Sequence, residues 1–197
     1  MHLPFKKLTS WQQITFAAAL LERMLPNYQM FAENVEFGKY SLLRNQLDLI
    51  WQKQDPTQRC KINYDAQLLK LEEQIPEPAE FDFFGVYPAL DAVMALMSTL
   101  QGMQDRESET AKIVSKLSEN SVTHYLELLI AQEEQLAEGE EVSESQINNH
   151  PLMLWEVDVQ KELSDLLLKS PEKKSTIDKA KSIVLEEGLS NLGIERS

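Results

Sequence analysis

The sequence predicts an all-α protein that folds as one domain, a helical bundle of about seven to nine helices. Apolar residues recur at helical spacing in most segments, whereas no alternating, strand-like pattern extends beyond a few residues. The 197 residues include only 6 Gly and 8 Pro, which leaves little material for the turns of an all-β chain. A chain of this length is sufficient for one well-buried core, so residues 1–197 are predicted to form a single domain.

The first helix is predicted to begin at Ser10, because Ser10 and Gln13 have capping-box spacing. It is expected to run to about Leu25, where Pro26 interrupts it. Proline suits the first turn of a helix, so a second helix is predicted to start there. Gly38 is expected to end that helix as a left-handed cap.

The next two helices have clear boundaries. Apolar residues on one face predict a helix over residues 40–54, and Asp55-Pro56 stops it. Asn63 is an N-cap for the following helix, which ends at the prolines of residues 76–78. The stretch AEFDFFGVY, residues 79–87, is aromatic, and we expect it to pack against the core.

The chain after this aromatic stretch is also helical. Pro88 precedes a nearly uniformly apolar helix that reaches Gly102, and residues 108–135 form one long helix or two joined near Asn120. Six glutamates and no cation between Glu133 and Gln146 predict a solvated acidic loop, at about 133–148.

Two further helices complete the chain. His150 and Pro151 are predicted to open one of them, and Ser170 with Pro171 the last, which Gly188 ends. Residues 189–197 form a short tail.

Asp91 is the one charged residue in the apolar helix that follows Pro88. At 100° per residue it shares a narrow, weakly polar stripe with Tyr87 and Ser98. A buried, unpaired carboxylate would cost several kcal/mol, so Asp91 needs a partner if the stripe is buried. Three alternatives stay open: a structural, paired group, a solvated stripe, or a group in a functional pocket. If Asp91 forms a buried ion pair, Asp91→Asn should lower the melting temperature.

A candidate pocket follows from the third alternative. Its residues are Phe84, Tyr87, Asp91 and Ser98, with Asp91 as acid or base and Tyr87, one turn earlier, as donor. Aromatic walls around one carboxylate match the way apolar pockets present few polar groups.

The net charge of −13 disfavours two classes of ligand. Residues 1–100 hold 12 acidic and 9 basic side chains, and residues 101–197 hold 20 and 10. Such a surface repels phosphate backbones and anionic lipids, so neither nucleic acid nor a membrane is expected as a partner. A cationic or neutral protein surface is compatible with this charge.

Recognisable catalytic and metal-binding motifs are absent from the sequence. There is no Gly-rich phosphate loop, G-x-S-x-G, H-E-x-x-H or C-x-x-C. His124 has Glu127 at i+3, but this reverses the Glu-x-x-His order of di-metal bundles and occurs once, so we interpret His124 as a helix-surface residue. We therefore assign no catalytic residue, metal or cofactor.

A cytoplasmic location is expected. Cys60 is the single cysteine, so no disulfide can form within the chain. The start of the sequence resembles a signal peptide superficially, but Gln12, Gln13 and Glu22 interrupt its apolar stretch. No run approaches the roughly 20 apolar residues that span a bilayer.

Four stretches, read in order, carry a resemblance to a known family: LLERMLPNYQMF, LDLIWQ, FDFFGVYPALDA and SNLGI. Together they resemble the YjaG-like family of uncharacterised proteobacterial proteins, and the resemblance extends over almost the whole chain. It implies an all-helical, bundle-like bacterial protein of one domain. It implies no activity, substrate or catalytic residue.

Two functions from different classes remain. The first is a helical protein-interaction or adaptor protein that acts through a surface groove or its acidic C-terminal half. If the acidic loop is the contact, deleting it should abolish capture of the partner. The alternative is a small-molecule binder or enzyme with a pocket beside Tyr87 and Asp91. The sequence does not fix the oligomeric state, so a homodimer stays open.

Overall fold

The computed structural model describes residues 3–106, 109–137 and 140–196. Over these ranges it holds no strand, one isolated β-bridge between Leu189 and Glu195, and ten helical segments. These segments are η1 (Phe5–Lys7), α1 (Ser10–Val35), α2 (Tyr40–Gln54), α3 (Tyr64–Glu72), η2 (Pro78–Glu80), α4 (Val86–Asp105), α5 (Thr110–Glu133), α6 (Glu144–Asn149), α7 (Pro151–Lys169) and α8 (Lys174–Leu185). The prediction of a single all-α domain is confirmed. None of the helices in the described ranges combines the length and apolar character needed to cross a bilayer.

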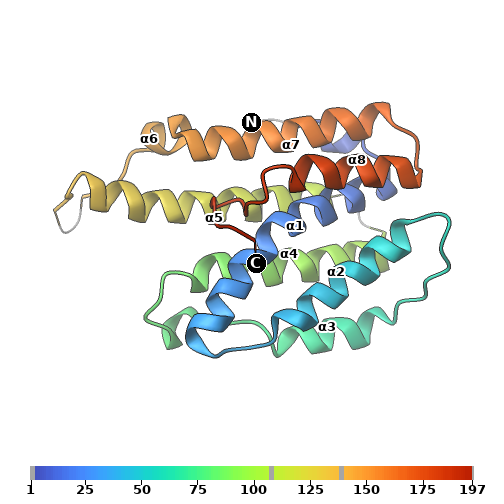
Figure 1. Ribbon diagram of the computed structural model, residues 1–197, viewed down its shortest axis with the longest axis horizontal. Helices are drawn as coiled ribbons and strands as arrows, with labels where there is room; N and C mark the ends of the chain where they lie inside the picture. Colours follow the sequence, from blue (N-terminus) through green and yellow to red (C-terminus); the bar gives the residue numbers. More distant parts are fainter. Residues whose placement is uncertain (1–2, 107–108, 138–139, 197) are drawn as a thin grey trace.

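Helix α1 is the centre of the bundle and contacts α2, α4, α5, α7 and α8. Figure 1 shows α1 crossing the middle of the molecule, with α7 and α8 above it and α2 and α3 below it. Every residue from Gln12 to Tyr28 is buried, so α1 has no solvent-facing side over these turns. A helix surrounded in this way buries its polar residues together with its apolar ones, and these polar residues need partners inside the core.

Both ends of α1 differ from the prediction. The N-cap is Thr9 rather than Ser10: its hydroxyl accepts the N–H of Gln12, and the Gln12 side chain accepts the N–H of Thr9. The capping box therefore lies one residue earlier than predicted. The helix ends at Glu36, which adopts the left-handed conformation (φ 54°), and Gly38 (φ 66°) lies in the turn that follows.

The predicted break at Pro26 is wrong, because α1 continues through Pro26 to Val35. Proline removes the N–H that would bond the Glu22 carbonyl, a change that breaks helices in isolation. In this protein the surrounding helices bury both sides of the interruption. In addition, the tail residue Asn191 donates its N–H to the adjacent carbonyl of Arg23 at 3.1 Å.

Several other predicted boundaries are confirmed. Helix α2 spans the predicted residues, and the side chain of Asn63 caps α3 by accepting the N–H of Ala66 at 3.2 Å. At the start of α7, Nδ1 of His150 accepts the N–H of Leu152 at 3.1 Å. The alternative that the sequence left open for residues 108–135 is settled from Thr110 onward, where α5 is one continuous helix.

The acidic segment at about 133–148, predicted to be a loop, is helical in its last part. Ser143 and Gln146 form a capping box that starts α6. Ile147, in the middle of α6, is buried in a second apolar cluster with α5 and α7. One buried apolar residue and a capping box therefore accompany this short helix. The many glutamates around them led to the prediction of a loop.

Helix α8 is shorter than predicted. Ser170 and Pro171 lie in the preceding turn, where the Thr176 hydroxyl donates to the Pro171 carbonyl at 2.7 Å. The helix therefore begins at Lys174. It ends at Leu185, before Gly188, which has a positive φ of 66°.

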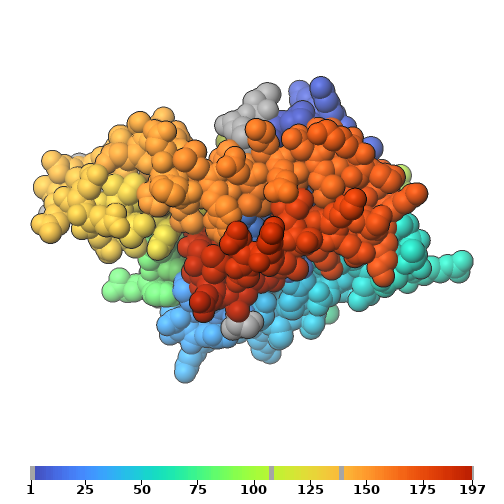
Figure 2. Space-filling model, turned by 45° about the horizontal axis from the view of Figure 1, so that its top comes forward, coloured from blue at the N-terminus to red at the C-terminus, as the bar shows by residue number. Residues whose placement is uncertain are grey.

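The tail after α8 is part of the core rather than a free end. Figure 2 shows the red C-terminal segment lying across the molecule beside α7. Asn191 is buried, accepts a hydrogen bond from the Asn27 amide at 2.7 Å, and donates to the Ser118 hydroxyl at 3.0 Å. The tail therefore ties α1 to α5.

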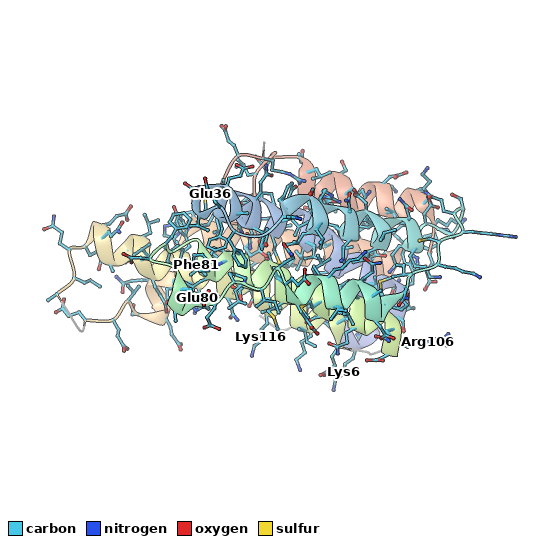
Figure 3. The ribbon with its side chains drawn as sticks, turned by 90° about the horizontal axis from the view of Figure 1, so that it is seen from below. Lys6, Glu36, Glu80, Phe81, Arg106 and Lys116 are labelled. Carbon is cyan, nitrogen blue, oxygen red and sulfur yellow. The ribbon has the colours of Figure 1, made fainter. Side chains whose placement is uncertain are left out.

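The aromatic segment before α4 packs on the core, as predicted. Phe31 of α1 contacts Phe81 with ring centroids 5.0 Å apart, and Phe83 at 6.3 Å. Phe37 contacts both Phe81, at 5.3 Å, and Phe31, at 5.9 Å, so the three rings form one cluster. In Figure 3, Phe81 lies close to Glu36, where the segment meets the end of α1.

Candidate functional site

Three of the four predicted pocket residues contact α5 along the seam between α4 and α5. The contacts are Asp91 with Ser121, Tyr87 with His124, and Phe84 with Tyr125. The residue numbers rise along α4 as they fall along α5, so the two helices are antiparallel. The Ser121 hydroxyl donates to the Asp91 carboxylate at 2.9 Å, and the ring centroids are 5.7 Å apart for Tyr87 with His124 and 6.2 Å for Phe84 with Tyr125.

Ser98, the fourth predicted residue, lies further along the same seam. It is half-buried and two turns from Asp91, a rise of about 10 Å. The antiparallel register places it opposite the turn of α5 that holds Ile113. The structure therefore brings Phe84, Tyr87 and Asp91 together and leaves Ser98 apart from them.

Asp91 is buried, with 9% of its surface exposed, so the solvated alternative is wrong. Its hydrogen-bond donor is the hydroxyl of Ser121 rather than a cation. Burial raises the pKa of Asp91 to about 6, although the Ser121 hydrogen bond and the charge of His124 lower it in part. The carboxyl group therefore changes protonation near neutral pH, in the range where a proton donor or acceptor is effective.

The predicted pocket beside Tyr87 and Asp91 stays a prediction. Two surface depressions are present elsewhere, one between α1 and the tail and one between α2 and α8. Neither is lined by residues of the α4–α5 seam. Tyr87 and His124 are exposed, whereas Asp91, one turn from Tyr87 on α4, is buried.

His124, considered for metal binding in the sequence, is exposed on α5. Within residues 3–106, 109–137 and 140–196, no group of three or more His, Cys, Asp or Glu side chains is arranged to hold a metal ion. The His124 ring contacts that of Tyr87, and its charge acts on Asp91.

A buried ion pair between α1 and α7 was not predicted from the sequence. Arg23 and Glu156 are 3.0 Å apart and their side chains are 1% and 0% exposed. The Arg23 guanidinium lies 4.0 Å from the centre of the Trp155 ring, and Glu156 accepts hydrogen bonds from Ser118 at 2.6 Å and Gln160 at 2.8 Å. The signal in the sequence was a charged pair inside the apolar run LLERML, whose partners lie far away in the chain.

Glu22, the neighbour of Arg23, is the centre of a second buried ionic group. Arg44 donates to both of its oxygens, at 2.7 and 3.0 Å, the Trp51 indole donates at 2.8 Å, and Arg196 of the tail at 3.0 Å. Burial raises the pKa of Glu22, but the hydrogen bonds and charge of Arg44, with the other donors, outweigh it, and the net pKa is lowered. Glu22 is therefore a stably ionised structural group.

The outward side of the seam carries exposed apolar side chains beside polar ones such as His124 and Lys116. Of the large apolar side chains exposed in the described ranges, four lie on α4 and α5, namely Tyr87 (44%), Met94 (38%), Ile113 (38%) and Leu128 (37%). We name these four residues the α4–α5 face. The remaining three, Leu69, Leu154 and Leu185, lie singly on α3, α7 and α8. Lys116, between Ile113 and Leu128 on α5, points outward at the lower edge of Figure 3.

The fold and this site define a class: a single-domain helical bundle with ionic groups buried around its central helix and an apolar face on one antiparallel helix pair. A family model described as a protein of unknown function, DUF416, matches residues 1–195. The chain belongs to this family, and the resemblance that the sequence carries is confirmed.

The relatives are similar over nearly their whole length. The uncharacterized protein YjaG of Escherichia coli (strain K12) is 37% identical over 195 residues, which cover 98% of this chain and 95% of the relative. An uncharacterized protein of Haemophilus influenzae is 36% identical over 199 residues, with 99% and 96% coverage. The crystal structure of a DUF416 family protein from Shewanella baltica is similar with a TM-score of 0.84 and 34% identity, covering 100% of both chains.

Proposed function

We propose that this protein is a helical interaction protein, or adaptor, that binds a partner protein on the α4–α5 face. The observation that supports the proposal most is the gathering of four exposed apolar side chains on one helix pair. Single exposed apolar residues are normal on protein surfaces, whereas contiguous patches mark interaction sites. A partner helix with an apolar stripe is the occupant that fits this face.

The spacing of the four residues supports a helical occupant. Tyr87 and Met94 are seven residues apart on α4, so they lie on one stripe two turns apart. Ile113 and Leu128 are separated by about 22 Å of rise along α5. The seam between two antiparallel helices is a site where an amphipathic helix docks through anchors at such spacings. A partner helix of about 15 residues, or four turns, spans this length.

The total accessible surface is larger than that of a compact monomer. It amounts to 10639 Å² for a chain of 22.6 kDa. A compact monomer of this mass exposes about 9,500 Å², so this chain exposes roughly a tenth more. Part of the excess comes from the end of α5 and α6, which project beyond the bundle in Figure 1.

The test is a photo-cross-linking amino acid placed at Met94 in living cells, with the same amino acid at Leu154 as the matched control. Both positions are exposed and apolar, but Leu154 lies outside the α4–α5 face. We expect a discrete cross-linked partner from position 94, none from position 154, and loss of the product when Leu128→Glu is added. Equal cross-linked products from both positions would refute the proposal. A product that contains only this chain would show that the molecule bound on the α4–α5 face is a second copy of the chain and not another protein.

The acidic loop offers the competing surface, and the two surfaces lead to opposite expectations. If the α4–α5 face is the contact, deleting residues 136–142 leaves the product from position 94 unchanged. If the loop is the contact, the deletion abolishes it. The strongly negative charge remains the argument against nucleic acid as the partner.

A small-molecule or enzymatic site at Asp91 is the second candidate. It is favoured by the assembly of a carboxyl, a hydroxyl, an imidazole and a phenol from Asp91, Ser121, His124 and Tyr87. A fragment screen by NMR tests it, with the imidazole signals of His124 and His150 as probe and control. A fragment that shifts the imidazole signal of His124 and not that of His150 supports a site at Asp91. A screen in which no fragment shifts the His124 signal refutes it.

We also propose a cytoplasmic location, supported by the single cysteine, which forms no disulfide within the chain. Fractionation of cells that express a tagged chain tests this location. Recovery in the periplasmic fraction would refute it.

A further inference from the structure

The groove between α2 and α8 is a second candidate binding surface, separate from the α4–α5 face. It has a volume of about 370 Å³, within the range of small ligand sites. We name it the α2–α8 groove, and it is lined by Asp48, Trp51, Gln52, Asp55, Gln58, Lys174, Ile177, Asp178 and Lys181. Figure 2 shows the region where the red-orange α8 lies next to the blue α2.

The two helices present matched faces to this groove. The lining residues of α8 follow the spacing i, i+3, i+4 and i+7, and those of α2 do so together with its C-cap Asp55, so one side of each helix faces the space between them. Trp51 and Ile177 are 5% and 4% exposed and form its apolar floor. The groove is therefore about two helical turns long, or roughly 10 Å.

The Trp51 ring is fixed in place and already carries a cation. Its indole N–H donates to Glu22 at 2.8 Å, and Glu22 is held in turn by Arg44. The Lys181 ammonium lies 4.6 Å from the centre of the Trp51 ring. A cation above an indole face is attracted by the ring quadrupole, so the floor of this groove favours positive charge.

The carboxylates around the ring differ in what they already bind. Asp48 is paired with Arg44 at 2.7 Å, and Asp55 accepts hydrogen bonds from Thr57 and Gln58. Asp178 makes no hydrogen bond or ion pair with any of the residues that the structure describes. Asp178 is exposed, and if Lys181 moves away, the Trp51 face beside it is also available to a cation from outside.

We propose that the α2–α8 groove binds a basic peptide segment, with a Lys or Arg side chain taking the place of the Lys181 ammonium on the Trp51 ring and pairing with Asp178. Of the three carboxylates that line the groove, Asp48 is already paired with Arg44, so displacement of Lys181 from the ring leaves Asp55 and Asp178 beside the ammonium of Lys174. The net charge of −13 attracts such a segment at long range. The flexible side chain of Lys181 acts as an internal competitor that keeps the site closed to weak ligands.

The test is an NMR titration of the full chain with a capped hexalysine peptide, which reads the indole N–H signal of Trp51. A capped hexaglutamate peptide is the control ligand. Lys181→Met removes the competitor and is expected to tighten hexalysine binding about threefold or more. Lys179→Met, which removes the same charge from an exposed position of α8, is expected to leave affinity within about twofold.

Asp178→Asn provides the opposite test. It is expected to weaken hexalysine binding about threefold or more. Asp165→Asn, which makes the same change of charge at an exposed residue of α7, is expected to have little effect. The proposal is overturned if hexalysine does not shift the Trp51 signal, or if each variant behaves like its charge-matched control. A melting curve of each variant verifies that it is folded.

Discussion

Replacing Asp91 with Asn is expected to stabilise the protein at pH 8. The sequence alone led to the opposite expectation for a carboxylate paired with a cation. In the structure the partner of Asp91 is the Ser121 hydroxyl, which an Asn side-chain oxygen accepts equally well. The substitution therefore removes a buried charge and keeps the hydrogen bond.

The magnitude follows from the pKa of Asp91, which burial raises from 3.8 to about 6. The folded protein then holds this proton more tightly than the unfolded chain does. The contribution of Asp91 to stability is therefore full below about pH 4 and is lost as pH rises through 6. A rise of roughly two pKa units means that the ionised Asp91 lowers the free energy of unfolding by about 3 kcal/mol at pH 8. About half of this loss is regained at pH 5.

Part of this gain is offset, because the new amide N–H group has to find an acceptor in the space of a carboxylate oxygen. For a chain of this size 1 kcal/mol shifts the melting temperature by about 2–4 °C. We therefore expect Asp91→Asn to melt about 3–8 °C above the parent protein at pH 8. The difference in melting temperature between the variant and the parent protein should be about half as large at pH 5.

The assay is thermal unfolding followed by circular dichroism at pH 5 and pH 8. Asp165→Asn on exposed α7 is the matched control and should show no gap at either pH. The comparison of Asp91→Asn with its parent is repeated in a His124→Asn background, which removes the imidazole whose charge lowers the pKa of Asp91. A variant that melts below the parent at pH 8, or a gap that is equal at both pH values, would refute the reasoning.

Three further changes test the core by urea unfolding. Arg23→Met leaves the buried Glu156 without its cation and should cost about 3–5 kcal/mol, so a cost below 1 kcal/mol would contradict the buried ion pair. Gly102→Ala places a Cβ against the Thr110 side chain and should cost about 1–3 kcal/mol, most of which Thr110→Ala should restore if the contact is the cause. Asn191→Ala removes hydrogen bonds to α1 and α5 and should cost about 2–4 kcal/mol, whereas an unchanged midpoint would show that these side-chain hydrogen bonds do not stabilise the fold.

The sequence predicted the fold well where local signals agree with the tertiary structure. The boundaries of α2 follow from apolar spacing and from Asp55-Pro56, and the cap of α3 follows from the side chain of Asn63. Both are confirmed. The continuation through Pro26 was not predictable, because the local rule for proline is correct for an isolated helix. Burial of α1 on all sides overrides that rule, and burial depends on helices far away in the sequence.

The candidate site was predictable only from its α4 side. The helical stripe correctly identified Asp91 as the polar exception and Tyr87 as its neighbour. The partners on α5 could not be found, because Ser121 lies 30 residues further along the chain and nothing local pairs it with Asp91. The exposure of Met94 was hidden for a related reason: in a helix that is apolar around most of its circumference, periodicity does not distinguish the exposed side from the buried one.

Among the carboxylates buried in the described ranges, Asp91 is the one whose charge is least compensated. Glu22 and Glu156 have guanidinium partners, and Asp55 accepts three hydrogen bonds, whereas Asp91 has one hydroxyl donor, that of Ser121. Because Asn is expected to be more stable at this position, any role of Asp91 must depend on its charge or its proton. Asp91 lies one helical turn from Tyr87 of the α4–α5 face, so the cross-linking experiment separates the alternatives. An Asp91→Asn chain that melts higher and still yields the product from position 94 has lost nothing that binding requires, whereas one that melts higher without the product assigns Asp91 to the interaction itself.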